Sequence, residues 1–314
     1  MTLAILSLLG GLVLLAFGAD GLVRGSSSMA LRMGVTPLVV GLTIVAFGTG
    51  SPEMIVSLQA ALSGNSDLAL GNIVGSNICN VALILGVAAL ARPLQVRSAL
   101  LLREVPIMVA VTLLMVALLN DGEIGRLDGL VLTLGALVYT AWAYISARRE
   151  RNAEVAAEFA QEMPKPQPTW ARAALLVAAG FVGLLLGANI LVYGAVVIAQ
   201  ALGMSQVVIG LTVIAIGTSL PELATSVVAA MRNDSDVAFG NVLGSNILNI
   251  LLILGVVAMI QPISGAGLRP LDRGALAASA ILLLPLMWRG RILNRWEGAI
   301  LLAGYVAYVA ATLS

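Results

Sequence analysis

The sequence contains no histidine and a single cysteine, Cys79, among its 314 residues. Without histidine, the chain lacks the commonest general base, proton relay and metal-binding side chain of proteins. One cysteine cannot close an internal disulfide, and Cys79 lies in an apolar stretch, where we interpret it as a small packing residue. These absences argue against histidine-based chemistry and say nothing about the redox compartment.

Charged side chains are also scarce. They make up 11% of the residues, whereas a soluble domain has about 25%. Hydrophobic residues make up 60%, and the mean hydropathy is +1.02. We therefore expect an all-α membrane protein surrounded by the lipid bilayer. The net charge of +1 argues against nucleic acid as a partner. No protein partner can be inferred.

Long apolar segments recur along the whole chain. A helix needs about 20 apolar residues to cross the hydrocarbon core, and on that criterion we expect ten transmembrane helices. No basic region precedes the first run, so we interpret it as a retained helix rather than a cleaved signal peptide. The ten spans lie near residues 2–23, 36–62, 68–90, 99–119, 127–147, 172–200, 206–231, 237–261, 273–288 and 296–313.

The chain repeats itself at an offset of 169 residues. Residues 41–86 and 210–255 agree at 25 of 46 positions, and the matches include Pro, Glu and Asn in register. Chance similarity between apolar helices does not produce such matches, so the repeat is real. We expect a first five-helix repeat (1–147), a cytoplasmic linker (148–170) and a second five-helix repeat (171–314).

The number of helices in each repeat determines their relative orientation. Because five is odd, the second repeat enters the membrane from the opposite side, which makes the two repeats inverted. Of the 17 Lys and Arg residues, 14 fall in loops on one side, and only Arg126, Arg269 and Arg273 fall on the other. The positive-inside rule then places both termini outside and the linker in the cytoplasm. We expect the protein to lie in the plasma (inner) membrane.

Two glutamates lie near the middle of equivalent spans, in GTGSPE (48–53) and GTSLPE (217–222). An unpaired charge at that depth costs at least ~2.5–3.5 kcal/mol. No Lys or Arg lies in the middle of any span, so Glu53 and Glu222 have no partner for a buried ion pair. Bound cations or protons are the remaining partners.

The neighbouring residues supply further oxygen atoms. Pro52 and Pro221 lack an N–H group, so the helices of spans 2 and 7 must break and leave carbonyls free. The next span of each half carries a stripe of polar residues at helical spacing: Asn72, Ser76 and Asn80, then Asn241, Ser245 and Asn249. Hard oxygen donors suit Ca²⁺ and Na⁺ and suit zinc or copper poorly. Packing alone could explain each feature singly, but it does not explain their joint repetition.

These paired motifs, GTGSPE with GNIVGSNICN and GTSLPE with GNVLGSNILN, resemble the two alpha-repeats of the sodium/calcium exchanger family. The resemblance covers essentially the whole chain in its ten-helix form. It implies a central cation site, alternately open to each side, in which Glu53 and Glu222 are the shared carboxylates. It further implies that the shell is completed by Thr49, Thr218, Ser76, Ser245, Ser219, Asn80 and Asn249, with the carbonyls of Ala46 and Ala215.

Two departures from the family pattern affect the choice of ions. Gly50 stands where the second repeat has Ser219, so one Na⁺ position lacks a hydroxyl and the stoichiometry stays open. Some relatives carry an aspartate where this chain has Asn249, and its absence argues against K⁺ co-transport. Affinity, selectivity among divalent cations, oligomeric state and regulation are also left open.

The sequence therefore predicts a secondary active antiporter, with Na⁺-driven Ca²⁺ export as its function and no resident cofactor. The alternative is an H⁺-coupled exchanger of Ca²⁺ or another divalent cation on the same scaffold, because glutamate serves both. An intramembrane enzyme is disfavoured because histidine and mid-span Ser–Lys or Asp–Asp pairs are missing, and broken inverted helices favour alternating access over a channel. We further expect residues 2–35 and 172–205 to slide over a fixed core and switch access.

Overall fold

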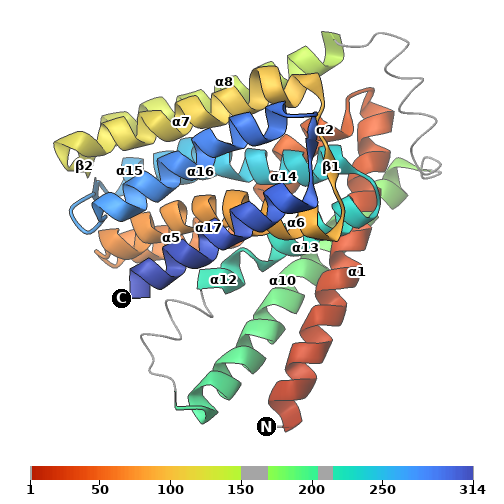
Figure 1. The fold of residues 1–314 in the computed structure, drawn as a ribbon, viewed down its shortest axis with the longest axis horizontal. Coiled ribbons are helices and arrows are strands. Elements are labelled where there is room, and N and C mark those ends of the chain that lie inside the picture. Colours follow the sequence, from red (N-terminus) through yellow and green to blue (C-terminus); the bar gives the residue numbers. More distant parts are fainter. Residues whose placement is uncertain (1, 150–168, 204–214, 314) are drawn as a thin grey trace.

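The computed structural model describes residues 2–149, 169–203 and 215–313, and this part of the chain is mostly helical (Figure 1). In the first half, α1 (Thr2–Met33) is followed by a broken segment, α2 (Pro37–Val40), η1 (Gly41–Val45), α3 (Ala46–Thr49) and α4 (Ser51–Leu62). Next come α5 (Ser66–Ile78), η2 (Cys79–Ile84), α6 (Leu85–Ala91), η3 (Leu100–Glu104), α7 (Val105–Leu118), η4 (Leu119–Asp121) and α8 (Arg126–Arg149).

The second half follows the same order. It contains α10 (Trp170–Ala201), α12 (Ala215–Thr218), α13 (Leu220–Met231), α14 (Ser235–Leu248), η6 (Asn249–Leu254), α15 (Gly255–Ile260), α16 (Pro270–Trp288) and α17 (Arg295–Leu313). Most of the expected linker and the start of the span expected near 206–231 lie outside the described residues.

Seven helices of the described chain are long and apolar enough to cross a membrane. The count rises to eight when the bent pair Pro37–Thr49 and Ser51–Leu62 is taken as one span. The first helix is longer than its apolar run predicts. It continues to Met33 because the polar segment after Arg24 stays helical and buries Ser26, Ser27 and Ser28.

The two most buried spans form the centre of the molecule. Within Ser66–Ala91 and Ser235–Ile260, 78% of the apolar window is buried, compared with 28% for α1 and for α10. Each central span contains a π-helical turn that includes the last residue of its Ser/Asn stripe, η2 in the first half and η6 in the second. Such turns interrupt the regular helical register and often mark functional sites.

Helices α1 and α10 lie side by side and cross the other helices steeply (Figure 1, red and light green). Glycines spaced seven residues apart line their contact, at Gly11, Gly18 and Gly25 on α1 and at Gly180, Gly187 and Gly194 on α10. A Cβ on Gly18 would lie 2.7 Å from the Leu184 nitrogen, so the two backbones are in direct contact. The outer pair therefore packs without interlocking large side chains.

Short antiparallel strand pairs join the two halves at opposite ends of the helices (Figure 1). Strand β1 (Leu94–Gln95) pairs with β4 (Ile292–Leu293), and β2 (Glu123–Ile124) pairs with β3 (Ile263–Ser264). Each pair unites a loop of the first half with a loop of the second half.

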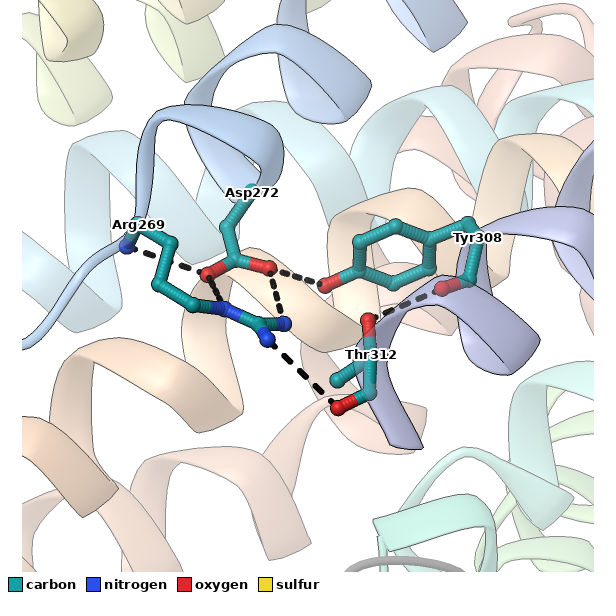
Figure 2. Close-up of polar contacts among 4 residues, drawn as sticks. All are labelled: Arg269, Asp272, Tyr308 and Thr312. Atoms are coloured by element: carbon teal, nitrogen blue, oxygen red, sulfur yellow. Dashed lines mark hydrogen bonds and ion pairs between the residues drawn. The ribbon is translucent and has the colours of Figure 1, made fainter. Parts of the chain in front are cut away.

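Buried or half-buried polar contacts join neighbouring helices in both halves. Figure 2 shows Asp272 of α16 bound by the Arg269 side chain and by the Tyr308 hydroxyl of α17, while Arg269 also reaches the Thr312 carbonyl. In the first half the Tyr139 hydroxyl donates to Glu104 Oε2 at 2.9 Å. The position of Glu104 near a span boundary predicts a solvated or paired carboxylate; Glu104 is paired, and it is also buried.

The loop polar groups agree with the sequence only in part. Asp20 and Arg24 are four residues apart on the first helix, which predicts an ion pair. The pair is present at 3.0 Å, and Arg232 also pairs with Asp20. In the sequence, Asp67 and Asp236 each stand just before an apolar span, which predicts that they cap helices, and this prediction is wrong. The capping side chains are those of Asn65 and Asp234, which accept the N–H groups three residues ahead, because the helices begin two residues earlier than the aspartates suggest.

Candidate functional site

The site is built on the two helix breaks. In the first half, Pro37–Thr49 and Ser51–Leu62 meet at Gly50 and are bent by 46°. In the second half, α12 ends at Thr218 and α13 begins after Ser219. Each proline falls in the first turn of the new helix, where its missing N–H group costs nothing. Each glutamate follows in that turn, where the positive end of the helix dipole favours a carboxylate.

Each glutamate faces the break of the opposite half. The Ser219 hydroxyl donates to Glu53 Oε1 at 3.3 Å. Conversely, a Cβ added to Gly50 would lie 3.9 Å from Glu222 Oε1. Both glutamates are only 1% exposed, so neither carboxylate is turned toward the lipid-facing surface.

Several buried oxygens around the breaks have no hydrogen-bond partner among the described residues. They are Glu53 Oε2, Glu222 Oε2, Asn80 Oδ1 and Ser245 Oγ. A buried polar atom without a partner costs about 1–3 kcal/mol, and more when it is charged. All four belong to residues that the sequence nominated, and all four can bind a cation directly. No cluster of three or more His, Cys, Asp or Glu occurs in the described chain, which leaves mixed oxygen donors.

Thr49 is held by the opposite half through an asparagine. Its hydroxyl donates to Asn241 Oδ1 at 3.0 Å. The Asn241 amide nitrogen in turn donates to Ser226 Oγ at 2.9 Å and to the Glu222 carbonyl at 3.2 Å. Since the Thr49 hydrogen is used in this bond, its oxygen can still offer lone pairs to a cation.

The first half repeats this bracing around Glu53. The Asn72 amide donates to Ser57 Oγ at 2.9 Å and to the Glu53 carbonyl at 3.3 Å. Thr218, the counterpart of Thr49, is the last residue of α12 and is half-buried. The stripe asparagines Asn72 and Asn241 thus brace the two glutamate-bearing helices instead of facing the centre of the site.

Of the remaining nominated residues, Ser76 and Asn249 meet between the two central spans. The Asn249 amide nitrogen donates to Ser76 Oγ at 3.0 Å, which joins the stripes of the two halves. Ala46 is buried, but its carbonyl accepts the Gly50 N–H at 3.0 Å, so only its second lone pair is available. Ala215 is the first residue of α12.

Asn77 and Asn246 were missed by the sequence analysis, although they bond to the site residues. Asn80 Nδ2 donates to Asn246 Oδ1, and Asn249 Nδ2 donates to Asn77 Oδ1, both at 3.0 Å. The signal was present, because the two asparagines match at the repeat offset. They were passed over because they lie outside the stripe defined by a regular helix.

A cavity of about 160 Å³ opens beside the first break. It is lined by Ala46, Phe47, Gly50, Ser51, Met54, Ile55, Leu248, Asn249, Leu252 and Ile253. The cavity therefore lies between the broken helix of the first half and η6, and it reaches the site at Gly50 and Asn249.

Comparison with known proteins decides the family. A family model described as "Sodium/calcium exchanger protein" matches residues 3–145 and 172–314. The chain belongs to the sodium/calcium exchanger family. A protein of Alkalimonas amylolytica named "Putative antiporter CaxA" is 41% identical over 98% of both chains. Sodium/calcium exchanger MaX1 of Methanosarcina acetivorans is 32% identical, again over 98% of both chains.

A solved structure of the sodium-calcium exchanger NCX_Mj superposes on this family member with a TM-score of 0.86. The two sequences are 32% identical, and the match covers 99% of each chain. The two halves that the family model matches correspond to the two repeats seen in the sequence. The chain is thus a multi-pass membrane protein from a family of cation antiporters.

Proposed function

We propose that this protein exports Ca²⁺ in exchange for Na⁺, by alternating access to a mid-membrane site built around Glu53 and Glu222. In this proposal the ten apolar segments form two inverted five-helix repeats in the inner membrane. The transported ions are bound by the oxygens of the site: Glu53, Glu222, Thr49, Thr218, Ser76, Ser245, Ser219, Asn80 and Asn249, with the carbonyls of Ala46 and Ala215.

One observation carries the proposal. Two buried carboxylates each face the helix break of the opposite half, and each keeps one oxygen without a partner among the described residues. Two negative charges in this position are tolerated only when positive charge joins them. Carboxylate, hydroxyl and amide oxygens are the donors that Ca²⁺ and Na⁺ prefer.

Charge balance then gives the coupling. One Ca²⁺ neutralises both carboxylates, and so do two Na⁺ ions, so the two kinds of ion compete for the same oxygens. With neither bound, the doubly negative site resists the change of access, because moving uncompensated charge through apolar surroundings is costly. The protein therefore exchanges ions and does not leak them.

The strand pairs support the proposed topology. The loops that carry β1 and β4 are both cytoplasmic in the inverted arrangement, and the loops that carry β2 and β3 are both external. Arg92 binds the Met231 carbonyl and Arg97 pairs with Asp236, which adds the loop near residue 232 to the cytoplasmic group. These contacts agree with the side that the positive charges select.

Transport in liposomes tests the proposal. Purified protein with an outward-directed Na⁺ gradient should accumulate labelled Ca²⁺, and collapse of the Na⁺ gradient should stop the uptake. Uptake that follows a pH gradient and ignores Na⁺ would instead favour the proton-coupled alternative, and the absence of Ca²⁺ movement under either gradient would contradict both.

The two glutamates provide the first mutational prediction. Glu53→Gln and Glu222→Gln should each lower exchange by about 100-fold or more, because each removes a buried charge that the cation needs as its partner. Circular dichroism should show an intact fold. Glu123→Gln is the matched control, since the Glu123 side chain is exposed on the short strand β2, and its exchange rate should equal that of the unmodified protein.

A further inference from the structure

Four asparagines form a hydrogen-bonded cluster where the two central spans meet. They are Asn77, Asn80, Asn246 and Asn249, and none is more than 3% exposed. Asn80 and Asn249 belong to the proposed ion site, whereas Asn77 and Asn246 do not. We propose that Asn77 and Asn246 are positioning residues that fix which atom of each ligand amide faces the ions. This inference rests on the proposed function.

The amide of Asn249 is held by its nitrogen end. Its Nδ2 donates to Asn77 Oδ1 and to Ser76 Oγ, both at 3.0 Å. Its Oδ1 therefore points the other way, and lies 3.8 Å from where a Cβ on Gly50 would be. Glu222 Oε1 lies 3.9 Å from the same point, so the amide oxygen and the carboxylate oxygen converge beside the first helix break.

Asn80 is held in the same way from the other half. Its Nδ2 donates to Asn246 Oδ1 at 3.0 Å. Its Oδ1 is buried and has no partner among the described residues. Both ligand amides thus use their nitrogen for a fixed contact and keep their oxygen for a ligand.

The positioning asparagines are themselves fixed by a reciprocal pair of bonds. Asn77 Nδ2 donates to the Asn246 carbonyl at 3.4 Å, and Asn246 Nδ2 donates to the Asn77 carbonyl at 3.3 Å. Each residue's nitrogen is therefore engaged with the opposite backbone, and only its oxygen can meet the ligand amide. A flipped amide at either position would set nitrogen against nitrogen and oxygen against oxygen.

This arrangement matters because an amide has nearly the same shape in both orientations. Only the oxygen binds a cation, while the NH₂ group repels it. A partner that sets the orientation in advance spares the ion the cost of turning the amide on binding. Residues that orient metal ligands in this way typically change affinity by about 10–100-fold when they are replaced.

A double-mutant cycle separates positioning from packing. Asn77→Leu keeps the branched shape and the number of heavy atoms of the side chain but removes the acceptor for Asn249, and we expect it to weaken Ca²⁺ binding by at least about tenfold. Asn249→Asp supplies two equivalent oxygens, which need no orientation. In the Asn249→Asp background the loss caused by Asn77→Leu should shrink to less than about twofold, whereas a packing role predicts the same loss in both backgrounds.

The measurement is isothermal titration of purified protein with Ca²⁺ or Na⁺, with thermal unfolding to confirm folding. The cycle of Asn246→Leu with Asn80→Asp repeats the test in the other half, and it decides the matter if Asn77→Leu does not fold. Wild-type affinity in Asn77→Leu, or a loss that Asn249→Asp does not rescue, would overturn the inference. Failure of the unmodified protein to bind either ion would instead overturn the proposed function.

Discussion

At position 50 the chain carries a glycine where the equivalent position of the second half carries Ser219. The consequence is visible in the site, because Ser219 donates a hydrogen bond to Glu53, whereas Gly50 has no side chain to offer Glu222. The two carboxylates therefore have unequal surroundings, although the repeats that carry them are closely matched.

Gly50→Ser should make the site more symmetric. The backbone at this position, with φ −77°, accommodates any residue. The new Cβ would lie 3.0 Å from the Ala46 carbonyl, a tight contact, and 3.9 Å from Glu222 Oε1. One added hydroxyl ligand should raise Na⁺ affinity by about fivefold. Ca²⁺, which already draws on both carboxylates, should be affected less.

The Na⁺ dependence of Ca²⁺ uptake in liposomes measures this effect. Gly10→Ser is the control, because a Cβ there meets no described atom within 4 Å. An unchanged Na⁺ dependence in Gly50→Ser would show that the hydroxyl at this position has no part in ion binding.

Among the residues of the site, sequence and structure agree best where the chemistry is local. Pro52 and Glu53 predicted a helix break with an acid beside it. A missing N–H group interrupts a helix in any fold, and a buried charge needs a partner in any fold. The roles of Asn77 and Asn246 could not be predicted. They depend on which neighbours the opposite half presents next to the π-helical turns η2 and η6.

At the scale of elements, α1 is fastened to the loop before α14 by two polar contacts. Asp20 pairs with Arg232, and the Ser27 hydroxyl donates to Asp234 Oδ2 at 2.7 Å. Burial raises the pKa of the Asp234 carboxyl above its ordinary value, although the Ser27 and Val237 hydrogen bonds and the Arg97 charge lower it. The sequence of the second half does not repeat these two contacts, because Asn189 occupies the position equivalent to Asp20 and Val196 the position equivalent to Ser27.

Ser27→Ala should loosen this end of α1. A hydrogen bond to a charged group contributes about 1.5–3 kcal/mol, and its loss leaves Asp234 with less compensation for its burial. Hydrogen–deuterium exchange should rise by about tenfold or more in the last turns of α1 and around residue 232. Ser7→Ala is the control, since Ser7 bonds only the Leu3 carbonyl of its own helix. Equal exchange in both variants would exclude the fastening.

The contact between α1 and α10 gives a prediction in which two glycines of one helix behave oppositely. Gly18→Ala places a methyl group 2.7 Å from the Leu184 nitrogen and should destabilise the protein by about 1–3 kcal/mol. Gly10→Ala meets no described atom within 4 Å and should leave stability unchanged or raise it by about 0.5–1 kcal/mol. Thermal unfolding in detergent compares the two, and similar midpoints would show that the helices separate easily.

The extent of α1 was not predictable from hydropathy. The apolar run stops near Asp20 and Arg24, so the span was expected to end at residue 23, yet the helix continues to Met33. Small side chains at Ser26, Ser27 and Ser28 can be buried against other elements, and tertiary packing keeps the segment helical. The sequence correctly predicted an apolar helix there. It could not predict the tertiary contacts that bury the polar end of this helix.

For the whole molecule, the contrast in burial between the central spans and the outer pair suggests how access changes. Ser66–Ala91 and Ser235–Ile260 are enclosed by other helices, whereas α1 and α10 bury a much smaller share of their residues. The hypothesis that α1 and α10 slide over a fixed core therefore assigns the motion to helices that are less enclosed than the two central spans.

Cross-linking tests this motion. With Cys79→Ala as background, Asp20→Cys and Arg232→Cys introduce a thiol pair across the contact between α1 and the core. A reducible cross-linker should stop Ca²⁺ uptake and leave equilibrium Ca²⁺ binding intact, and reduction should restore uptake. Each single-cysteine variant treated with the same reagent is the control. Continued transport by the cross-linked protein would refute the sliding of α1.

The strand pairs at the two ends of the bundle also limit how the halves can move. Because β1 pairs with β4 at one end and β2 pairs with β3 at the other, main-chain hydrogen bonds join the two repeats at both ends. Separation of the two halves at either end would have to break the strand pair at that end. We therefore expect access to change by movement of α1 and α10 along the other helices, and not by rocking of the two halves against each other.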